Sequence, residues 1–425
     1  TLAQPFGFKA EHGEGVSLVD ISRGAKPKRA IYSETHYPRL HFGWSDLHSL
    51  IAGSDHFIEA PKPELYNLGS DPTELKNVLG EQRRIYAAMK QQIAPYIKEA
   101  AAPAAIDPEQ AQQLAALGYI GSSISTDPGA ALPDPKDRIE SLRTVKNGLV
   151  AFQAGRYEEA VGLFGAILAS NPRMIDIWSM QTRALEKVGR KAEAIEAAKS
   201  GLRVSPTATN LALMIANDAL DLGRYDEAEQ HAKLALRDVP SQAHVIMAQA
   251  ALARKQFDKA TSEANLAAGS NRDRPIALML LGQVALQQGH VEEALTQFNQ
   301  AMALISQKKH QPIPRLNFHR GDALARLGRM DEAEQAFRAE IAQYPADPGP
   351  YKNLILLYAM EGRNDAATEL IFAAEKAAPV PPTYIAIAEA LKTIGDANGA
   401  KFWTARGLQR FPKDPALRQL AARLL

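Results

Sequence analysis

A helical pattern with a fixed period covers about the last two thirds of the chain. An alanine stands at the same place in eight consecutive segments, at spacings of 34, 34, 32, 34, 39, 34 and 33 residues. These are Ala160, Ala194, Ala228, Ala260, Ala294, Ala333, Ala367 and Ala400. A period near 34 is typical of stacked helix pairs, in which each pair buries its apolar face against its neighbours. The pattern therefore predicts a helical solenoid.

Glycine and proline mark the predicted turns. Seven of the eight segments have a glycine five residues before the alanine, and the fourth has Lys255 there. Glycine readily adopts the left-handed backbone that ends a helix. In six segments a proline follows twelve residues after the alanine, and it can begin a helix but cannot continue one. Each segment is expected to form two helices, with the alanine letting them approach closely.

The turn residues resemble the tetratricopeptide repeat. The string Gly223 to Ala228 (GRYDEA) carries the resemblance, and Trp178, Gly148, Gly282 and Gly321 fill further positions of that family's pattern. The match covers about residues 137–414. It implies a mainly α fold, a right-handed superhelix of eight helix pairs at 138–414 with a capping helix at 415–425. It also implies a groove that binds a protein or peptide.

The first 120 residues have a different pattern. Arg29–Thr35, Asp55–Ala60 and Glu64–Leu68 are short β-prone runs separated by turn residues. A helical pattern runs from Leu79 to Glu99, after a start signal at 71–74. We expect a small antiparallel sheet with a helix across it.

This region resembles the C-terminal subdomain of bacterial sulfatases of the alkaline phosphatase superfamily. The resemblance covers about residues 1–121 and rests on the strings at 15–24, 29–47 and 63–78. The matching positions of the last string are Glu64, Leu65, Tyr66, Leu68, Asp71, Pro72, Glu74 and Asn77. Residues 106–121 resemble the short helix that joins such sulfatases to a repeat tail, and residues 122–137 are expected to form a linker.

The resemblance implies an exported or periplasmic parent protein with its catalytic core upstream. Arg39, His41 and Trp44 would border the pocket of that full sulfatase, although a purely structural loop explains them as well. The family's nucleophile needs a C/S-x-P-x-R string, and this chain has no cysteine and no serine that opens one. The nearest string, Ser70 to Glu74, ends in Glu and is better explained as a helix cap. We therefore expect no catalytic residue, no cofactor and no enzymatic activity in this chain, and calcium only in an intact sulfatase core.

Composition excludes several other classes of function. Lys and Arg number 49 and Asp and Glu 48, so the net charge of +1 gives no reason to expect nucleic acid as a partner. No apolar run approaches the length that spans a bilayer. Five histidines fall in the first 56 residues, but their spacing matches no familiar metal-ligand pattern. They are His12, His36, His41, His48 and His56.

The first helix of each pair supplies the candidate binding residues. Alignment on the alanines gives a mainly polar row of Arg183, Asn217, Gln249, Gln283 and Asp322. A neighbouring apolar row holds Leu213, Val245, Met279 and Phe318. Amides in a ladder can bond an extended peptide backbone, while apolar residues can take its side chains. A merely solvated helix face is the competing interpretation.

The sequence thus predicts an interaction scaffold that forms the C-terminal part of a sulfatase-like protein. The alternatives are a sulfuric ester hydrolase in the intact parent, with the repeats recruiting substrate or partners, and a stand-alone repeat adaptor. An apolar stripe on the first predicted helix further suggests that the N-terminal unit or the linker docks there. The stripe consists of Leu142, Val145, Leu149 and Phe152.

Overall fold

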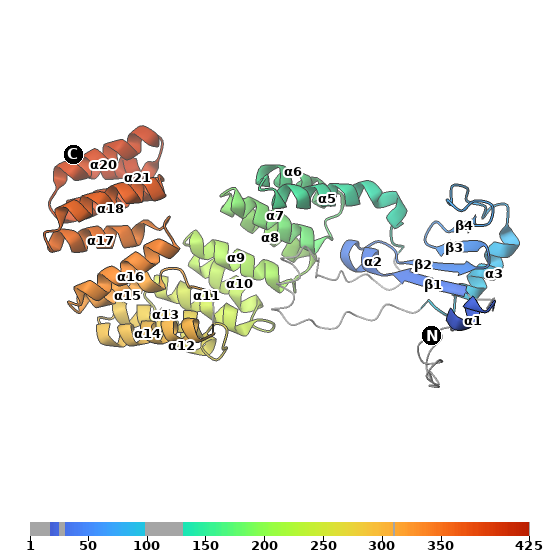
Figure 1. Cartoon of the computed structure of the whole chain (residues 1–425), viewed down its shortest axis with the longest axis horizontal. Coiled ribbons are helices and arrows are strands. Elements are labelled where there is room, and N and C mark those ends of the chain that lie inside the picture. Colours follow the sequence, from blue (N-terminus) through green and yellow to red (C-terminus); the bar gives the residue numbers. More distant parts are fainter. Residues whose placement is uncertain (1–17, 25–29, 98–130, 309–310, 425) are drawn as a thin grey trace. The chain divides into compact units, whose positions relative to one another are not determined.

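The computed structural model of the chain describes residues 18–24, 30–97, 131–308 and 311–424. These residues are mainly helical, with one small sheet near the N-terminus (Figure 1). The chain divides into two compact units, residues 1–211 and 212–425. The predicted joining helix at 106–121 and His12 lie outside the described residues.

The sheet of the first unit is antiparallel, with its four strands in the order β1-β2-β3-β4. The strands are β1 Ala30–Thr35, β2 Leu47–Ala52, β3 Asp55–Glu59 and β4 Glu64–Asn67. The helices nearby are α1 Leu18–Ser22, α2 Tyr37–Phe42 and α3 Arg83–Ile93. Helix α3 packs on β2 and β3, and its Met89 and Ile93 form a buried core with Leu50, Phe57 and Leu65. The predicted sheet with a helix across it is confirmed.

Two details of this region differ from the prediction. Strand β2 was missed, because its buried positions are His48 and Leu50 and a histidine breaks the expected alternation. The helix begins at Arg83 and not near Leu79. The signal at Asp71 closes a turn instead, since its carboxylate accepts a hydrogen bond from the Lys76 backbone N–H at 2.8 Å.

After residue 131 the described residues form a short 3-10 helix, eight helix pairs and a final helix. The elements of the first unit are η2 Pro135–Arg138, α5 Ile139–Gln153, α6 Tyr157–Ser170, α7 Ile175–Lys187 and α8 Lys191–Val204, and α9 Thr209–Asp221 spans the boundary. The second unit continues with α10 Tyr225–Leu234, α11 Pro240–Ala253, α12 Phe257–Ala267, α13 Arg274–Gln287, α14 Val291–Lys308, α15 Leu316–Arg326, α16 Met330–Gln343, α17 Pro348–Met360, α18 Asn364–Ala377, α19 Pro381–Thr393, α20 Ala397–Arg410 and α21 Pro415–Leu424. Each of the eight alanines lies on the second helix of its pair.

The turns within the pairs have the predicted left-handed backbone. All seven turn glycines have positive φ, and Gly223 has a φ of 70°. Lys255, which replaces glycine in the fourth segment, adopts the same conformation at φ 57°. A side chain with a Cβ is strained there, so the turn geometry is imposed by the packing of the two helices.

Three pairs close on a contact between glycine and phenylalanine. Phe164, Phe298 and Phe337 are buried, and each ring lies on a glycine of the preceding helix. A Cβ added to Gly282 would lie 2.5 Å from the Phe298 ring, and Gly148 and Gly321 have the same relation to their partners. The aromatic ring therefore occupies the space that any larger residue on the first helix would need.

The other five pairs fill the same two positions differently. Two have alanine at both positions and two combine alanine with threonine, while the seventh has two isoleucines. These pairs are Thr182 with Ala198, Ala216 with Ala232, Ala248 with Ala264, Ile355 with Ile371 and Ala388 with Thr404, and all ten residues are buried. Glycine stands only where its partner is phenylalanine, whereas Ile355 and Ile371 are large at both positions.

The N-terminal sheet is attached to the first helix pairs of the same unit. Phe42 and Trp44 belong to one buried cluster with Val145, Ile167 and other residues of α5 to α7. The Asn171 side chain donates a hydrogen bond to the Phe42 carbonyl at 2.9 Å. The expected docking on the first pair is confirmed, but it runs through α2 and the α6–α7 turn. Leu149 and Phe152 are half-buried against this cluster, whereas Leu142 stays exposed.

Residues 131–137 take part in this attachment. Asp134 is buried, and its carboxylate accepts hydrogen bonds from the backbone N–H groups of Lys136 at 2.9 Å and Lys62 at 3.0 Å. The Pro133 carbonyl accepts a hydrogen bond from the Ser45 backbone N–H at 2.9 Å. The described end of the predicted linker is therefore held in place against the sheet.

The pairing of glycine with phenylalanine can be tested by a double-mutant cycle. Gly282→Ala should destabilise the protein by about 1–3 kcal/mol through overpacking, and Phe298→Ala by about 3–5 kcal/mol. The double variant reproduces the Ala248–Ala264 arrangement, so it should cost less than the sum. Urea unfolding followed by circular dichroism measures all three.

Gly162→Ala is the control for this cycle, because a Cβ there meets no atom within 4 Å. It should raise stability by about 0.5–1 kcal/mol, as expected for a helical glycine without close neighbours. Fully additive losses at Gly282 and Phe298 would contradict the size-matching account.

Candidate functional site

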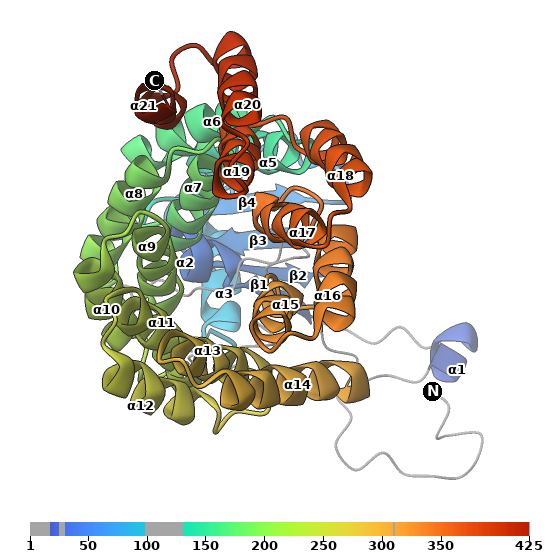
Figure 2. The same ribbon diagram turned by 90° about the vertical axis from the view of Figure 1, so that its left-hand side faces the viewer.

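The first helices of the second unit carry the two candidate rows. Figure 2 shows α11, α13, α15, α17 and α19 on the inner side of this unit's curved stack and their partner helices on the outer side. The polar row lies eleven residues before each repeat alanine and the apolar row fifteen before it. We call the surface formed by these two rows in the second unit the inner face.

The polar row is accessible to solvent. Asn217 is exposed, while Gln249, Gln283 and Asp322 are half-buried. In the apolar row Leu213 and Phe318 are half-buried, but Val245 and Met279 retain only 8% and 6% of their exposure. Most of the surface of Val245 and Met279 is therefore buried by packing within the array. The polar row offers more exposed surface to a partner.

Both rows continue beyond the residues predicted from the sequence. The same alignment places Lys352 and Leu356 on α17 and Ile385 and Glu389 on α19. Lys352 Nζ lies 2.6 Å from Glu389 Oε2. This ion pair joins the apolar-row position of one repeat to the polar-row position of the next, so the two rows are direct neighbours on the inner face. Counting back 11 and 15 residues from Ala367 and Ala400 would have predicted these four residues from the sequence.

Two amides on the inner face lack partners. No hydrogen bond is formed by the side chains of Gln249 and Gln283 within the described part of the chain, although both are half-buried. Asn217 donates to the Leu213 carbonyl at 3.0 Å, and Asp322 pairs with Arg326 at 3.0 Å. Each free amide offers a carbonyl acceptor and two N–H donors. The centre of the inner face can therefore bond a partner without first breaking an internal contact.

The remaining sequence-predicted residues lie in the first unit. Arg183 is exposed on α7. Arg39 pairs with Asp46 at 3.0 Å, and His41 lies 3.8 Å from the Asp176 carboxylate on α7. Trp44 is buried and packs on Phe42 with ring centres 4.6 Å apart. His41 and Trp44 therefore help attach the sheet to the repeats.

Two carboxylates on the outer helices link neighbouring repeats. Glu229 accepts hydrogen bonds from Arg254 and Lys259 of the next repeat, at 2.6 and 2.7 Å. Glu334 accepts from Tyr358 and Arg363 of the next repeat, both at 2.7 Å. Each directly follows a repeat alanine. Hydrogen bonds from Arg363, Tyr358 and Arg338 lower the pKa of Glu334 from 4.5 to about 2.

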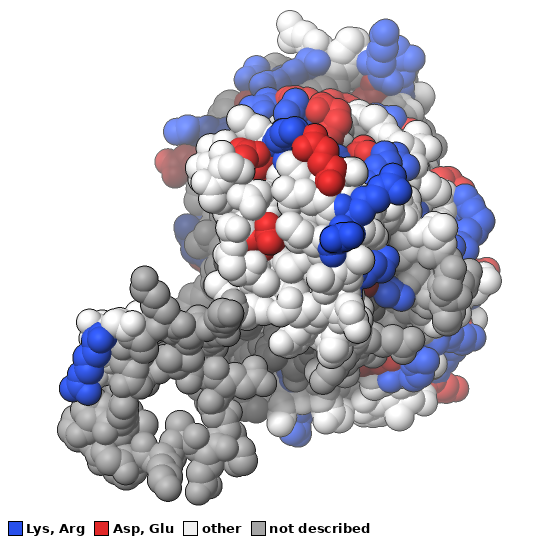
Figure 3. Space-filling model, turned by 90° about the vertical axis from the view of Figure 1, so that its right-hand side faces the viewer, with Lys and Arg blue, Asp and Glu red and all other residues white. Residues whose placement is uncertain are grey.

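On the face drawn in Figure 3, acidic and basic side chains lie interspersed around an uncharged centre. The described residues contain no cluster of three or more His, Cys, Asp or Glu that could hold a metal ion. They also contain no helix long and apolar enough to cross a membrane.

Comparison with protein families identifies the repeats. The model of a tetratricopeptide repeat-like domain matches residues 240–356, and that of a tetratricopeptide repeat matches residues 145–208. The chain contains tetratricopeptide repeats. Both matched segments lie within the eight helix pairs, and the first includes Gln249 and Gln283. No curated protein matches the chain.

Several solved structures resemble the tetratricopeptide array at low identity. The hetero-tetramer Cut9–Hcn1 of APC/C is 18% identical with a TM-score of 0.43, and the match spans 66% of this chain but only 55% of that one. A tetratricopeptide repeat protein from Parabacteroides merdae ATCC 43184 is 18% identical, with a TM-score of 0.42 and coverage of 59% and 98%. The type IV pilus biogenesis factor PilW is 16% identical, with a TM-score of 0.42 and coverage of 50% and 98%.

The link between repeats at Glu334 should depend on pH. Since its folded pKa lies below the usual 4.5, its stabilising effect is present above pH 4.5 and is lost as the pH falls towards 2. Glu334→Gln should cost about 1–2 kcal/mol at pH 7, less than the full linkage value because the pair is partly solvated. The cost should shrink at pH 3, as measured by thermal unfolding in both buffers.

Glu332→Gln is the matched control, because Glu332 pairs with Arg329 of its own repeat, three residues away, and its side chain is 42% exposed. Its cost should stay below about 0.5 kcal/mol. Equal effects of the two variants, or a Glu334→Gln cost independent of pH, would show that the link does not stabilise the array.

Proposed function

We propose that the chain is a protein-interaction scaffold that binds an extended peptide segment on the inner face of its second unit. The observation that carries this proposal is the pair of unpartnered, half-buried amides at Gln249 and Gln283. Both amides remain accessible to solvent, and a bound peptide backbone would replace their water molecules with direct hydrogen bonds. Tetratricopeptide repeats are consistent with such a role.

The neighbouring groups define what kind of segment fits. An extended peptide presents N–H and C=O groups alternately, which suits amides that both donate and accept. Leu213 and Phe318 are half-buried at either end of the candidate rows and can receive apolar side chains. Asp322 and the Lys352–Glu389 pair leave little net charge on this face. A largely uncharged segment with apolar side chains is therefore the preferred partner.

The proposal also includes an origin for the sheet region that precedes the repeats. The sulfatase-like strings at 15–24, 29–47 and 63–78, together with the small antiparallel sheet crossed by α3, support descent from a sulfatase C-terminal subdomain. In that arrangement the attachment through Phe42 and Trp44 would tie the tetratricopeptide array to an upstream domain. The chain would then position the array's partner near that domain.

Selection from a library of random peptides tests the binding face. Peptides that bind the whole chain are measured by fluorescence anisotropy against Gln249→Ala and Gln283→Ala. Each substitution should weaken binding by about three- to tenfold, as expected for the loss of one or two neutral hydrogen bonds. Gln300→Ala, at an exposed glutamine of the outer helix α14, is the matched control and should bind unchanged.

A library that yields no binder would refute the proposal. Binders that tolerate the Gln249→Ala/Gln283→Ala double variant would place the interaction elsewhere on the molecule.

A further inference from the structure

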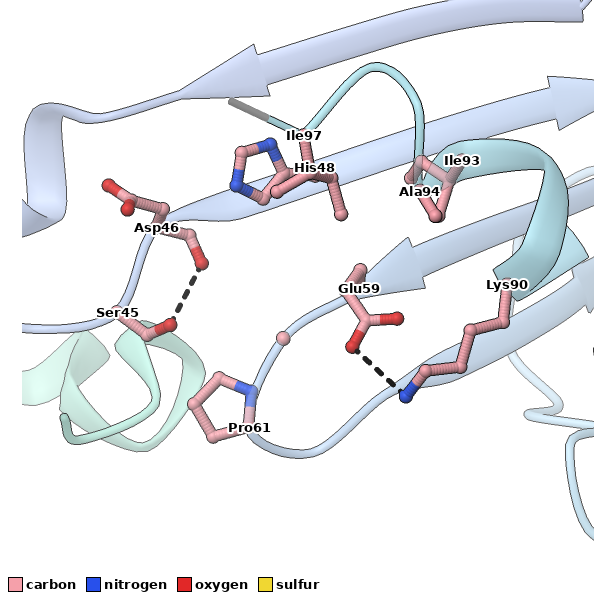
Figure 4. A pocket seen from close by; sticks show the side chains of 10 residues that line it. Ser45, Asp46, His48, Glu59, Pro61, Lys90, Ile93, Ala94 and Ile97 are labelled. Carbon is pink, nitrogen blue, oxygen red and sulfur yellow. Dashed lines mark hydrogen bonds and ion pairs between the residues drawn. The ribbon is translucent and has the colours of Figure 1, made fainter. Parts of the chain in front are cut away.

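A cavity of about 470 Å³ lies in the N-terminal part of the first unit, on the sheet face that carries α3 (Figure 4). Its lining residues come from β2, β3, α3 and the segments that follow them: Ser45, Asp46, His48, Glu59, Ala60, Pro61, Lys90, Ile93, Ala94 and Ile97. This volume falls within the range of small-molecule binding sites. The peptide-binding proposal does not involve this cavity.

Strand register places ionisable side chains in one row across this face. Glu34 on β1 faces His48 on β2, and His48 faces Glu59 on β3. Asp46 precedes β2 and pairs with Arg39 at 3.0 Å, while Lys90 on α3 lies 3.6 Å from Glu59. His36 lies 3.1 Å from Asp46 and 3.6 Å from Glu34. With His36 neutral, three carboxylates are matched by two permanent cations, which leaves the cavity region with a net negative charge.

His48 adds an acceptor to this region. Tyr32 donates its single hydroxyl proton to the Glu34 carboxylate at 2.6 Å. The Tyr32 oxygen, 2.8 Å from His48 Nδ1, must therefore accept a hydrogen bond from the Nδ1–H group. Burial lowers the pKa of His48 below 6.5, so at neutral pH its other nitrogen, Nε2, carries a lone pair and no proton.

The Nε2 atom of His48 is left without a partner. The His48 side chain is only 9% exposed, and its ring stands among the residues that line the cavity (Figure 4). Within the described residues no hydrogen bond to Nε2 is formed. The Oε2 atom of Glu59, which also lines the cavity, is buried and has no hydrogen-bond partner within the described residues. A buried acceptor needs a donor, and the surplus negative charge favours one that is cationic.

Part of the cavity lining is apolar. It consists of Pro61 after β3 and of Ile93, Ala94 and Ile97 at the end of α3 (Figure 4). A ligand whose charged end reaches His48 and the carboxylates would lay its stem along these residues. The cavity thus combines one cation-accepting end with one hydrocarbon-accepting side.

We propose that this cavity binds an ammonium or guanidinium group carried on a short alkyl stem. The group donates hydrogen bonds to His48 Nε2 and neutralises the surplus charge of Glu34, Asp46 and Glu59. Two sources have this chemistry, namely a free alkylamine or alkylguanidine and the lysine or arginine side chain of a protein segment.

Isothermal titration of the full chain with butylguanidinium chloride tests the site. Butylurea, which has a similar shape and no charge, serves as the ligand control. We expect saturable binding of butylguanidinium and none of butylurea. Acetyl-Gly-Arg-Gly-amide separates the two sources, because tighter binding of this peptide assigns the site to a protein side chain and weaker binding assigns it to a free cation.

Two substitutions locate the binding. Glu59→Gln removes one cavity charge at constant shape and should weaken butylguanidinium binding by about fivefold or more. Ala94→Phe fills the apolar side and should abolish it. Glu81→Gln removes an exposed carboxylate that pairs with Lys76 outside the cavity and should bind unchanged. Circular dichroism verifies that all three variants remain folded.

The proposal is wrong if butylguanidinium does not saturate the chain or if butylurea binds as tightly. It is also wrong if folded Glu59→Gln and Ala94→Phe variants both bind as the parent chain does.

Discussion

The packing of each helix pair depends on two facing buried residues, one on each helix. Where the first helix has glycine, the second presents a buried phenylalanine, as at Gly321 and Phe337. Alanine or threonine on the second helix goes with alanine or threonine on the first, as at Ala248 and Ala264, and Ile371 goes with Ile355. Because the helices pack at close range, the turn between them must reverse sharply, and even Lys255 adopts the left-handed backbone there. The geometry of each pair therefore determines which face of its first helix stays exposed and can bind a partner.

The inner face follows from this packing. One side of each first helix is used against its partner and another against the next repeat, which buries Val245 and Met279. The polar row lies beside these buried positions, where the Lys352–Glu389 pair shows that successive repeats are in contact. On the outer helices, carboxylates such as Glu334 accept hydrogen bonds from the next repeat and so join neighbouring repeats. These contacts hold the helices that carry the amides in place before a partner binds.

The sequence predicted the repeats well because their signals are local and repeated. Alanine, glycine and proline recur at fixed offsets, so the helix pairs could be placed from spacing alone. Strand β2 escaped prediction because it buries His48, and a buried histidine depends on partners from other strands such as Tyr32. The burial of Val245 and the attachment through Trp44 depend on contacts between distant segments, which spacing does not encode. The same holds for the cavity beside His48, which cross-strand register creates.

Hydrogen–deuterium exchange with and without a selected peptide tests the central claim most directly. The measurement compares the amide exchange of every helix in the second unit in the two states. If the inner face binds the peptide, the backbone amides of α11, α13 and α15 should become more protected from exchange. The exchange of the amides in α12, α14 and α16 should not change. Protection confined to the outer helices or to the N-terminal sheet would contradict the assignment of the binding site to the inner face.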